Sequence, residues 1–141
     1  MNKTIQASKD DPNAFKLNDT QKLINIYGIS NGMSYLHKNN VIHRNLTPLH
    51  ILESENYYPI INNISDAYVL KDDEENCIQP IGIYKNTLFV APETRLKHQY
   101  SMSTDVFAFG MTIYAIMKNE IPFQSIEQSN EINFSVSLNK E

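Results

Sequence analysis

The sequence predicts a small α+β domain, mainly helical, built from two helices and one β-hairpin. Three patterns predict it: a helical period that begins near Asn18, an apolar helix from about Thr104 to Lys118, and two short apolar runs separated by a polar turn. With 141 residues, 41% hydrophobic and 20% charged, the chain can build one modest core. The expected boundaries are a flexible lead-in at residues 1–17, one domain at residues 18–124 and a weakly structured tail at residues 125–141.

The first helix is predicted to start directly after Asn18. In the stretch NDTQ, Asn18 offers an N-cap side chain and Gln21 follows three residues later, which is the spacing of a capping box. The helix is expected to end within residues 37–40. Gly28 and Gly32 lie four residues apart on it, and each costs about 1 kcal/mol relative to Ala, so we expect this face to press against a neighbouring element. The apolar residues that recur at helical spacing are Ile26, Ile29, Met33 and Leu36.

A β-hairpin is predicted after this helix. Ile51-Leu52 and Pro59 to Ile61 are short apolar runs, and the polar turn Glu53 to Asn56 separates them. Residues 62–88 show no period and contain the acidic run Asp72 to Glu75. We therefore expect a long surface loop there, of the kind that is functional or disordered in compact domains.

The second helix contains the stretch VFAFGMTIYAIM, Val106 to Met117, which is apolar almost all the way round. Such a helix is typical of the middle of a domain. Ile121-Pro122 is expected to stop it. If later segments leave this helix partly uncovered, its apolar surface predicts either a partner or a piece that does not stand alone.

Composition excludes several classes of function. The net charge is −4 and the 12 Lys and Arg residues are spread along the chain, so neither nucleic acid nor an anionic membrane is an expected partner. The longest apolar run is too short to cross a bilayer, and the N-terminal stretch lacks the apolar core of a signal peptide. The single cysteine, Cys77, predicts a reduced thiol in the cytoplasm, with the nucleus as an alternative.

Four stretches in a fixed order carry a resemblance to a known family: GMSYLH (Gly32 to His37), IHRNLTP (Ile42 to Pro48), LFVAPE (Leu88 to Glu93) and DVFAFGMTIYAIM (Asp105 to Met117), followed by IPF (Ile121 to Phe123). In this order and at these separations they resemble the large, C-terminal lobe of eukaryotic protein kinases, in the tyrosine-kinase-like branch of the serine/threonine kinases. The resemblance covers roughly residues 22–123. It implies a partial large lobe with a buried central helix and a small β-hairpin, and no small lobe.

The resemblance puts altered residues at three catalytic positions. Asn45 stands where the family has its proton acceptor, and an amide has no basicity at neutral pH; loss of a general base costs ~10²–10⁴ in rate. Thr47 stands at the Lys that contacts the transferred phosphate. His50 stands at the second metal ligand, where Mg²⁺ prefers oxygen to a nitrogen donor.

The other metal position has two possible registers. Counting thirteen residues from His50, as the family counts, reaches Asn63, whereas a local match favours Asp66 with Ala67-Tyr68 after it. Asn63 is preferred because a three-residue insertion in a tight hairpin is less plausible than point changes. If Asp66 is the ligand, one metal carboxylate survives.

The remaining family positions imply structural roles. His43 would bond the start of the activation segment, or simply be a satisfied core histidine, and Asp105 would brace the loop backbone. Arg44 is the family's receiver for a phosphorylated activation loop, which the run Asp72 to Glu75 could meet as permanent negative charge; a solvated acidic loop is the simpler interpretation. The end of the activation segment is Ala91, Pro92 and Glu93, the last of which pairs with a later Arg in the family.

Two functions stay open on this basis. The 44 residues before Asn45 contain neither a Gly-rich loop nor a strand Lys, so nothing in them would cover a nucleotide. The first function is a catalytically inactive, pseudokinase-type scaffold that binds a protein, for example a kinase. The second is a divergent or truncated serine/threonine kinase that uses ATP and Mg²⁺. A gene fragment without a selected role is a third, duller possibility.

Overall fold

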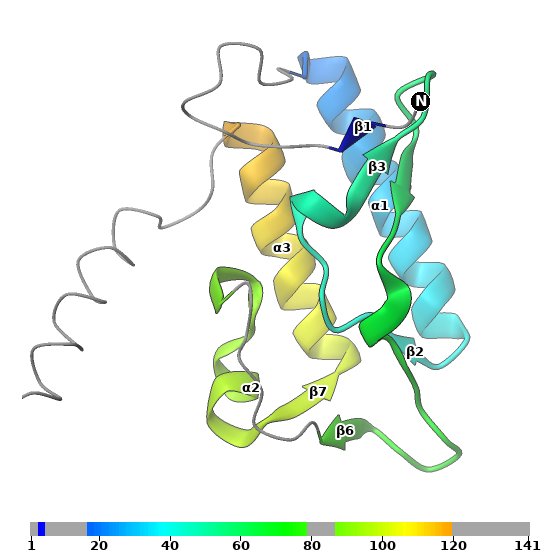
Figure 1. The fold of residues 1–141 in the computed structure, drawn as a ribbon, viewed down its shortest axis with the longest axis vertical. Helices are drawn as coiled ribbons and strands as arrows, with labels where there is room; N and C mark the ends of the chain where they lie inside the picture. Colours follow the sequence, from blue (N-terminus) through cyan, green and yellow to red (C-terminus); the bar gives the residue numbers. More distant parts are fainter. Residues whose placement is uncertain (1–2, 5–16, 79–86, 120–141) are drawn as a thin grey trace, which may run out of the picture.

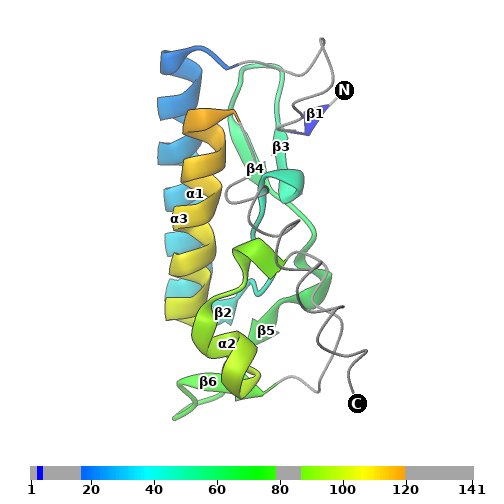
Figure 2. The same cartoon turned by 90° about the vertical axis from the view of Figure 1, so that its left-hand side faces the viewer.

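The computed structural model describes residues 3–4, 17–78 and 87–119. Two long helices form one layer, and the short strands with their connecting loops form the other, as Figure 1 and Figure 2 show. The helices are α1 (Asp19–Lys38), α2 (Pro92–Lys97) and α3 (Met102–Lys118). The strands are β1 (Lys3–Thr4), β2 (Val41–Ile42), β3 (Ile51–Glu53), β4 (Pro59–Ile61), β5 (Tyr68–Val69), β6 (Asn76–Ile78) and β7 (Gln99–Ser101). Helices with small antiparallel strand pairs are the mixed class that the sequence predicts.

The start of α1 confirms the predicted capping box. The Asn18 side chain accepts from the Gln21 N–H at 2.9 Å, and Gln21 Oε1 accepts from the Asn18 N–H at 2.9 Å. Two of the orphan donors at this helix end are thereby satisfied. The helix ends at Lys38, inside the predicted limit, where the Asn39 N–H bonds the Leu36 carbonyl at 3.0 Å.

Close packing of α1 against β4 explains the two glycines. A Cβ added at Gly28 would lie 2.4 Å from Pro59 Cγ, and one at Gly32 would lie 2.7 Å from Ile61 Cδ1. Both separations are well inside van der Waals contact. The prediction that this helix face presses against a neighbour is confirmed, and the neighbour is the second strand of the hairpin.

The predicted β-hairpin is confirmed, but its turn is shorter than expected. β3 and β4 are antiparallel with Ile51 opposite Ile61 and Glu53 opposite Pro59, and β1 pairs with the other edge of β3. Glu53 was predicted in the polar turn; instead it is the last residue of β3 and only 3% exposed. The prediction was wrong because the alternation of the strand continues by one residue and turns this side chain inward.

Residues 62–88 are not one unpatterned loop. They contain β5, which pairs with β2, and β6, which pairs with β7. Strands of two or three residues carry no readable period, which is why the sequence did not indicate them. Residues 79–86 lie outside the described part of the chain.

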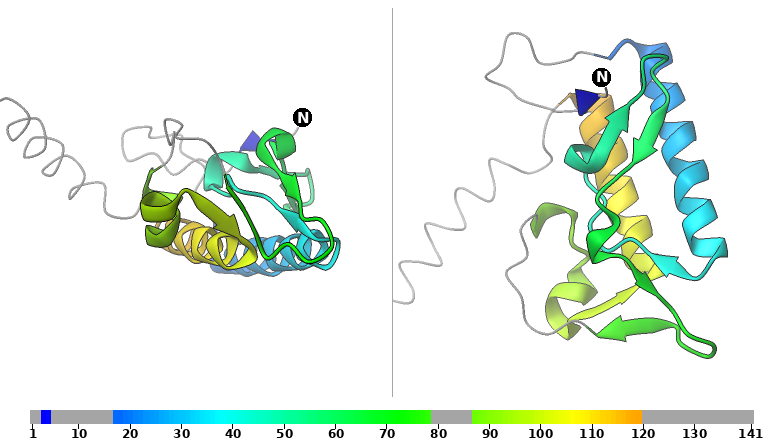
Figure 3. Two further views of the ribbon diagram at one scale, coloured as in Figure 1. Left: turned by 90° about the horizontal axis from the view of Figure 1, so that it is seen from below. Right: turned by 45° about the vertical axis from the view of Figure 1, so that its right-hand side comes forward.

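The helix α3 begins two residues earlier than expected and is buried on one side only. Ser101 is its N-cap and forms a capping box with Thr104, whose N–H lies 3.4 Å from Ser101 Oγ. The buried side includes Ala108, Thr112, Ala115 and Ile116, whereas the opposite side exposes Val106, Tyr114 and Met117. The prediction of a helix surrounded by the domain is therefore wrong for one of its faces. Figure 3, seen from below, shows α1 and α3 side by side with the strands on one side of both.

The two predicted flanking segments are described only in part. Within residues 1–17, β1 pairs with β3 and Leu17 is buried in the main core, a contribution that the lead-in prediction did not include. The residues of the predicted tail, and the predicted helix stop at Ile121-Pro122, lie outside the described residues. The main core joins Leu17 to Ile29, Met33, Leu46, Ile51, Ala108 and Ile116.

In the described part of the chain, residues other than glycine take the left-handed backbone conformations. None of the described glycines has a positive φ. Such backbone conformations cost a residue with a Cβ roughly 1–2 kcal/mol, and Asn pays least because of its short polar side chain. The left-handed residues are Asn40, Arg44, Tyr57, Asn63, Asp73, His98 and Asn119.

Candidate functional site

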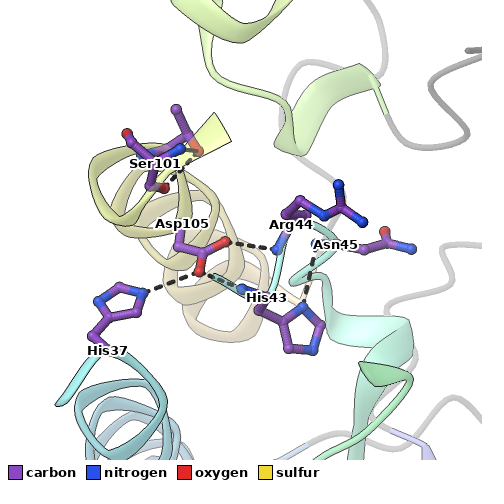
Figure 4. Close-up of polar contacts among 7 residues, drawn as sticks. His37, His43, Arg44, Asn45, Ser101 and Asp105 are labelled. Atoms are coloured by element: carbon purple, nitrogen blue, oxygen red, sulfur yellow. Dashed lines mark hydrogen bonds and ion pairs between the residues drawn. The ribbon is translucent and has the colours of Figure 1, made fainter. Parts of the chain in front are cut away.

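The loop that follows α1 is fastened to α3 by one buried carboxylate. Asp105, in the first turn of α3 and 1% exposed, accepts from the His43 N–H at 2.7 Å and from the Arg44 N–H at 2.9 Å. Figure 4 shows both bonds converging on this side chain. This is the backbone bracing that the resemblance implies for Asp105.

A third partner of Asp105 comes from the other helix. His37, in the last turn of α1, places Nε2 3.0 Å from Asp105 Oδ2 (Figure 4). The carboxylate therefore joins the end of α1, the loop and the start of α3. In the sequence His37 ends the motif GMSYLH, and the motif alone predicts no role for it. Its position at the end of an amphipathic helix was the signal that could have drawn attention to it.

His43 is a buried, neutral ring that organises the loop from inside. Its Nε2 lies 3.1 Å from the Asn62 carbonyl oxygen, and its Nδ1 accepts from the Asn45 N–H at 3.2 Å. A carbonyl only accepts, so Nε2 carries the ring proton and Nδ1 is free to accept. Burial has the largest influence on the pKa of His43 and lowers it below its usual value. The Asn62 carbonyl and the Asp105 carboxylate raise this pKa, but by less.

Asn45 donates a hydrogen bond where the family position would accept a proton. Its Nδ2 donates to Asp66 Oδ2 at 3.0 Å. The partner carboxylate lies at the end of a short 3-10 turn, Ile64–Asp66. The lone pair of an amide nitrogen is delocalised into the carbonyl group, so Asn45 offers no basic nitrogen to a hydroxyl proton. The structure thus brings together Asn45 and the alternative metal residue Asp66.

The two other metal positions bond to each other. Asn63 Nδ2 lies 2.9 Å from His50 Nε2, and His50 Nδ1 lies 2.7 Å from the Asn45 carbonyl oxygen. The amide donates and the carbonyl accepts, so His50 carries its proton on Nδ1 and accepts at Nε2. Ser65 Oγ then donates to Asn63 Oδ1 at 2.9 Å. The buried Thr47 places Oγ1 3.4 Å from His50 Nδ1.

These residues do not fit a magnesium ion. Mg²⁺ requires several oxygen ligands in near-octahedral geometry. Here His50 offers a ring nitrogen that already accepts from the Asn63 amide, the Asn63 oxygen accepts from Ser65, and one oxygen of Asp66 accepts from Asn45. Within residues 17–78 and 87–119, no three His, Cys, Asp or Glu side chains gather as metal ligands.

Arg44 lies between two aromatic rings rather than against the acidic run. Its guanidinium carbon is 5.9 Å from the Tyr68 ring centroid and 5.7 Å from that of Tyr100, which are cation–π distances. Its Nε also donates to the Asp66 carbonyl. Among the described residues, no ion pair joins Arg44 to the run Asp72 to Glu75.

The acidic run is anchored locally. Glu74 Oε2 accepts from the Tyr68 hydroxyl at 3.2 Å and from the Lys71 N–H at 3.0 Å, while Asp72 and Asp73 are exposed. Glu74 thus bonds the hydroxyl of the same Tyr68 ring that Arg44 lies over. Next to this cluster the Cys77 thiol is free and buried, and burial raises its pKa although Arg44 acts in the opposite direction.

The predicted end of the activation segment forms the start of α2, away from the bonds just described. Ala91 is the buried N-cap residue, Pro92 is the first helical residue and Glu93 is exposed in the first turn. Pro is suited to this position because its missing N–H is unsatisfied there in any case. Thr94 Oγ1 donates to the Gln99 carbonyl at 2.8 Å and ties α2 to β7.

Comparison with known proteins identifies the family. Residues 4–140 match the sequence model of the family described as protein tyrosine and serine/threonine kinase. A probable serine/threonine-protein kinase of Dictyostelium discoideum is 36% identical over 102 residues, which cover 71% of this chain and 11% of that protein. A G-type lectin S-receptor-like serine/threonine-protein kinase of Arabidopsis thaliana is 30% identical over 137 residues, 93% of this chain and 16% of that protein.

A vertebrate protein shows a similar level of sequence identity over a similar part of this chain. The alpha subunit of the inhibitor of nuclear factor kappa-B kinase of Gallus gallus is 30% identical over 113 residues, which cover 79% of this chain and 14% of that protein. The chain thus spans less than a fifth of the length of each of these three relatives. Because the family model matches nearly all of its residues, the chain belongs to the protein tyrosine and serine/threonine kinase family.

Proposed function

We propose that this kinase-family chain binds another protein and does not transfer phosphate. In this proposal it is a degenerate large lobe of the tyrosine-kinase-like branch, with the family's loop retained as a scaffold. The proposed partner is a protein, for example an active kinase, in the cytoplasm or the nucleus. Neither nucleic acid nor a membrane is proposed as a partner; in the described part of the chain, no helix combines the length and apolarity needed to span a bilayer.

The observation that carries the proposal is the direction of one hydrogen bond. Asn45 Nδ2 donates to Asp66 at 3.0 Å, so the residue at the proton acceptor's position is engaged as a donor. A general base contributes ~10²–10⁴ to the rate of a proton-transfer step, and an amide cannot replace it. The bond between Asn63 and His50 supports the same conclusion, because it occupies both metal positions.

The exposed side of the helical layer supports the binding function. Val106 and Met117 of α3 are 59% and 46% exposed, and Leu23 and Tyr27 of α1 are 64% and 71% exposed. The helices run alongside each other, and Lys22 Nζ donates to the Met117 carbonyl at 3.0 Å, so the end of α3 lies beside the start of α1. Contiguous exposed apolar side chains are typical of protein-interaction surfaces, and we propose that these residues on two adjacent helices contribute to one.

One observation favours the alternative of a divergent or truncated serine/threonine kinase. Asp66 keeps a carboxylate 3.0 Å from the Asn45 amide, so an acidic group is present at the loop although not at residue 45. A carboxylate so placed could receive a hydroxyl proton if a substrate reached it. In that alternative ATP and Mg²⁺ would be the cofactors.

Incorporation of radiolabelled phosphate separates the two functions. The purified 141-residue chain is incubated with labelled ATP, Mg²⁺ and a generic protein substrate, beside the variants Asn45→Ala and Asp66→Asn. We expect no incorporation above a no-protein blank for all three proteins. Metal-dependent incorporation that Asp66→Asn abolishes would establish the alternative. Thermal-shift titration with Mg-ATP detects binding without transfer, since a ligand at a hundred times its Kd adds about 2.7 kcal/mol.

The binding function has its own test. Immobilised protein captures partners from a cell extract, and the captured proteins are compared with those held by the double variant Val106→Asp, Met117→Asp. A matched control is Leu96→Asp, because Leu96 is 81% exposed on α2, outside the helical layer. Loss of the same proteins from the double variant and their retention by the control is the expected result. Equal capture by all three proteins contradicts the proposed surface.

A further inference from the structure

A buried acid and a buried amide face each other where the hairpin packs against α1. Glu53, the last residue of β3, is 3% exposed, and Asn25, in the middle of α1, is fully buried. Asn25 Nδ2 donates to Glu53 Oε1 at 2.6 Å. This contact lies on the hairpin, outside the hydrogen bonds of the candidate functional site. An ionised carboxylate is costly in such a place unless several donors or a cation compensate it.

The amide group of Asn25 leaves one oxygen without a partner. Its Nδ2 uses both hydrogens, one toward Glu53 and one toward the Gln21 carbonyl at 2.9 Å. These two acceptors fix the orientation of the amide, because flipping it would turn its oxygen toward both of them. Asn25 Oδ1 is then one of two buried side-chain atoms in the described residues that have no hydrogen-bond partner. A missing bond of this kind costs about 1–3 kcal/mol.

Among the described side chains of the neighbouring elements, none forms an ion pair with Glu53. On α1, Lys22 lies one turn before Asn25, but its Nζ donates to the Met117 carbonyl and lies 4.0 Å from Asp19. On β4, the residue opposite Glu53 is Pro59, which carries no charge. On β1, the residue opposite is Lys3, of which only the backbone is described.

We propose that Glu53 is protonated in the folded protein and forms a two-bond ring with Asn25, so that an acid–amide pair fastens the hairpin to α1. In this ring Asn25 donates through Nδ2 to Glu53 Oε1, and the carboxyl O–H donates through Oε2 to Asn25 Oδ1. The ring supplies the donor that Asn25 Oδ1 lacks. It also removes the buried negative charge. Protonation of Glu53 therefore accounts for both the unpartnered Asn25 oxygen and the buried carboxyl group.

The pair makes the stability of the fold depend on pH. Burial raises the pKa of Glu53 above its usual value, and the bond from Asn25 opposes this only in part. Above the ordinary pKa of Glu the unfolded chain releases the proton while the folded chain keeps it, so the folded state binds more protons. The contribution of Glu53 to the free energy of unfolding is therefore fully present below its pKa in the unfolded chain. It is lost as pH rises toward its pKa in the folded protein.

The matched variant is Glu53→Gln, which keeps both hydrogen bonds and cannot ionise. Urea unfolding of the 141-residue wild type and of this variant is measured from about pH 4 to about pH 8. We expect similar stabilities at the acid end. From about pH 4.3 upward, the wild-type unfolding constant should rise relative to the variant by up to tenfold per pH unit, until the folded pKa is reached.

Carbon NMR of the wild type tests the proposal even if the variant does not fold. The carboxyl carbon of Glu53 should titrate well above the ordinary Glu value of about 4.3. The variant Lys3→Gln tests whether that lysine, rather than the ring, sets this midpoint, and we expect it to leave the midpoint unchanged. An ordinary midpoint in the wild type, a marked rise in Lys3→Gln, or a pH-independent difference from Glu53→Gln would each overturn the proposal.

Discussion

The two sides of the loop after α1 contrast sharply. On its backbone side, the Asp105 carboxylate holds two loop N–H groups and His37, and all of these bonds join parts distant in sequence. On its side-chain side, Asn45 donates to Asp66, and His50 and Asn63 bond to each other. The bonds that hold the loop in shape and the side chains at the proposed catalytic positions therefore form two separate sets of contacts, and the first set depends on one buried carboxylate.

The largest effect should come from breaking the backbone side. Asp105→Ala leaves the His43 and Arg44 N–H groups and His37 without their acceptor. Loss of one partner from a buried charged contact costs about 3–5 kcal/mol, and we expect a fall of this size in the free energy of unfolding, measured in urea. Asp105→Asn keeps one acceptor oxygen and should lose less. A loss under about 1 kcal/mol in Asp105→Ala would contradict the bracing role.

A second test measures how tightly α1 packs against β4, for comparison with the bonds of Asp105. Gly28→Ala should destabilise the protein by about 1–3 kcal/mol, because the new Cβ would lie 2.4 Å from Pro59 Cγ. Gly110→Ala is the matched control: its Cβ would meet nothing within 4 Å, so helix propensity should stabilise the protein by up to about 1 kcal/mol. Thermal melting of the two variants measures both effects, and equal shifts would contradict the packing.

The third test uses pH on the backbone side. The pKa of His43 is lowered by burial, so between the ordinary His value, about 6.5, and the folded value the unfolded chain binds more protons. Stability should fall as pH drops through this window, by up to about 1.4 kcal/mol per pH unit. His43→Gln should remove this part of the pH dependence. Imidazole nitrogen NMR that shows His43 titrating at or above the ordinary value would refute the expectation.

The smallest effect is expected on the side-chain side. His50→Ala removes the bonds to Asn63 and to the Asn45 carbonyl, each worth about 0.5–1.5 kcal/mol in net stability. Urea unfolding should show a loss of that order, smaller than for Asp105→Ala. Phosphate incorporation should stay at the blank value. A change in incorporation on this substitution would connect His50 to chemistry and would weaken the contrast between the two sides.

Much of the fold could be predicted because strong local signals specify it. The capping box at Asn18 and Gln21, the apolar runs of the hairpin and the closely packed Gly28 and Gly32 all appear where the sequence places them. Each signal has a physical cause within a few residues. The order of the motifs also indicated the family before any contact was known.

The remainder depends on contacts between distant segments. The burial of Glu53 follows from packing against α1, and the stacking of Arg44 needs Tyr68 and Tyr100, which stand far apart in sequence. The role of His37 likewise requires the start of α3 to lie beside the end of α1. No local pattern contains this information. The sequence therefore predicts which residues belong to the site, but only some of the contacts between them.

The left-handed turns have a consequence for mutational tolerance. Glycines usually mark the places where a chain bends in a way that other residues resist. Here the described glycines stand in helices, and residues such as Tyr57 and His98 take the bends. The usual positions of essential glycines are thus reversed in the described residues. The bends can accept glycine without steric conflict, whereas a larger residue at Gly28 or Gly32 forces α1 and β4 apart. A mutational scan should find its intolerant glycines in the regular helix rather than at the corners of the chain.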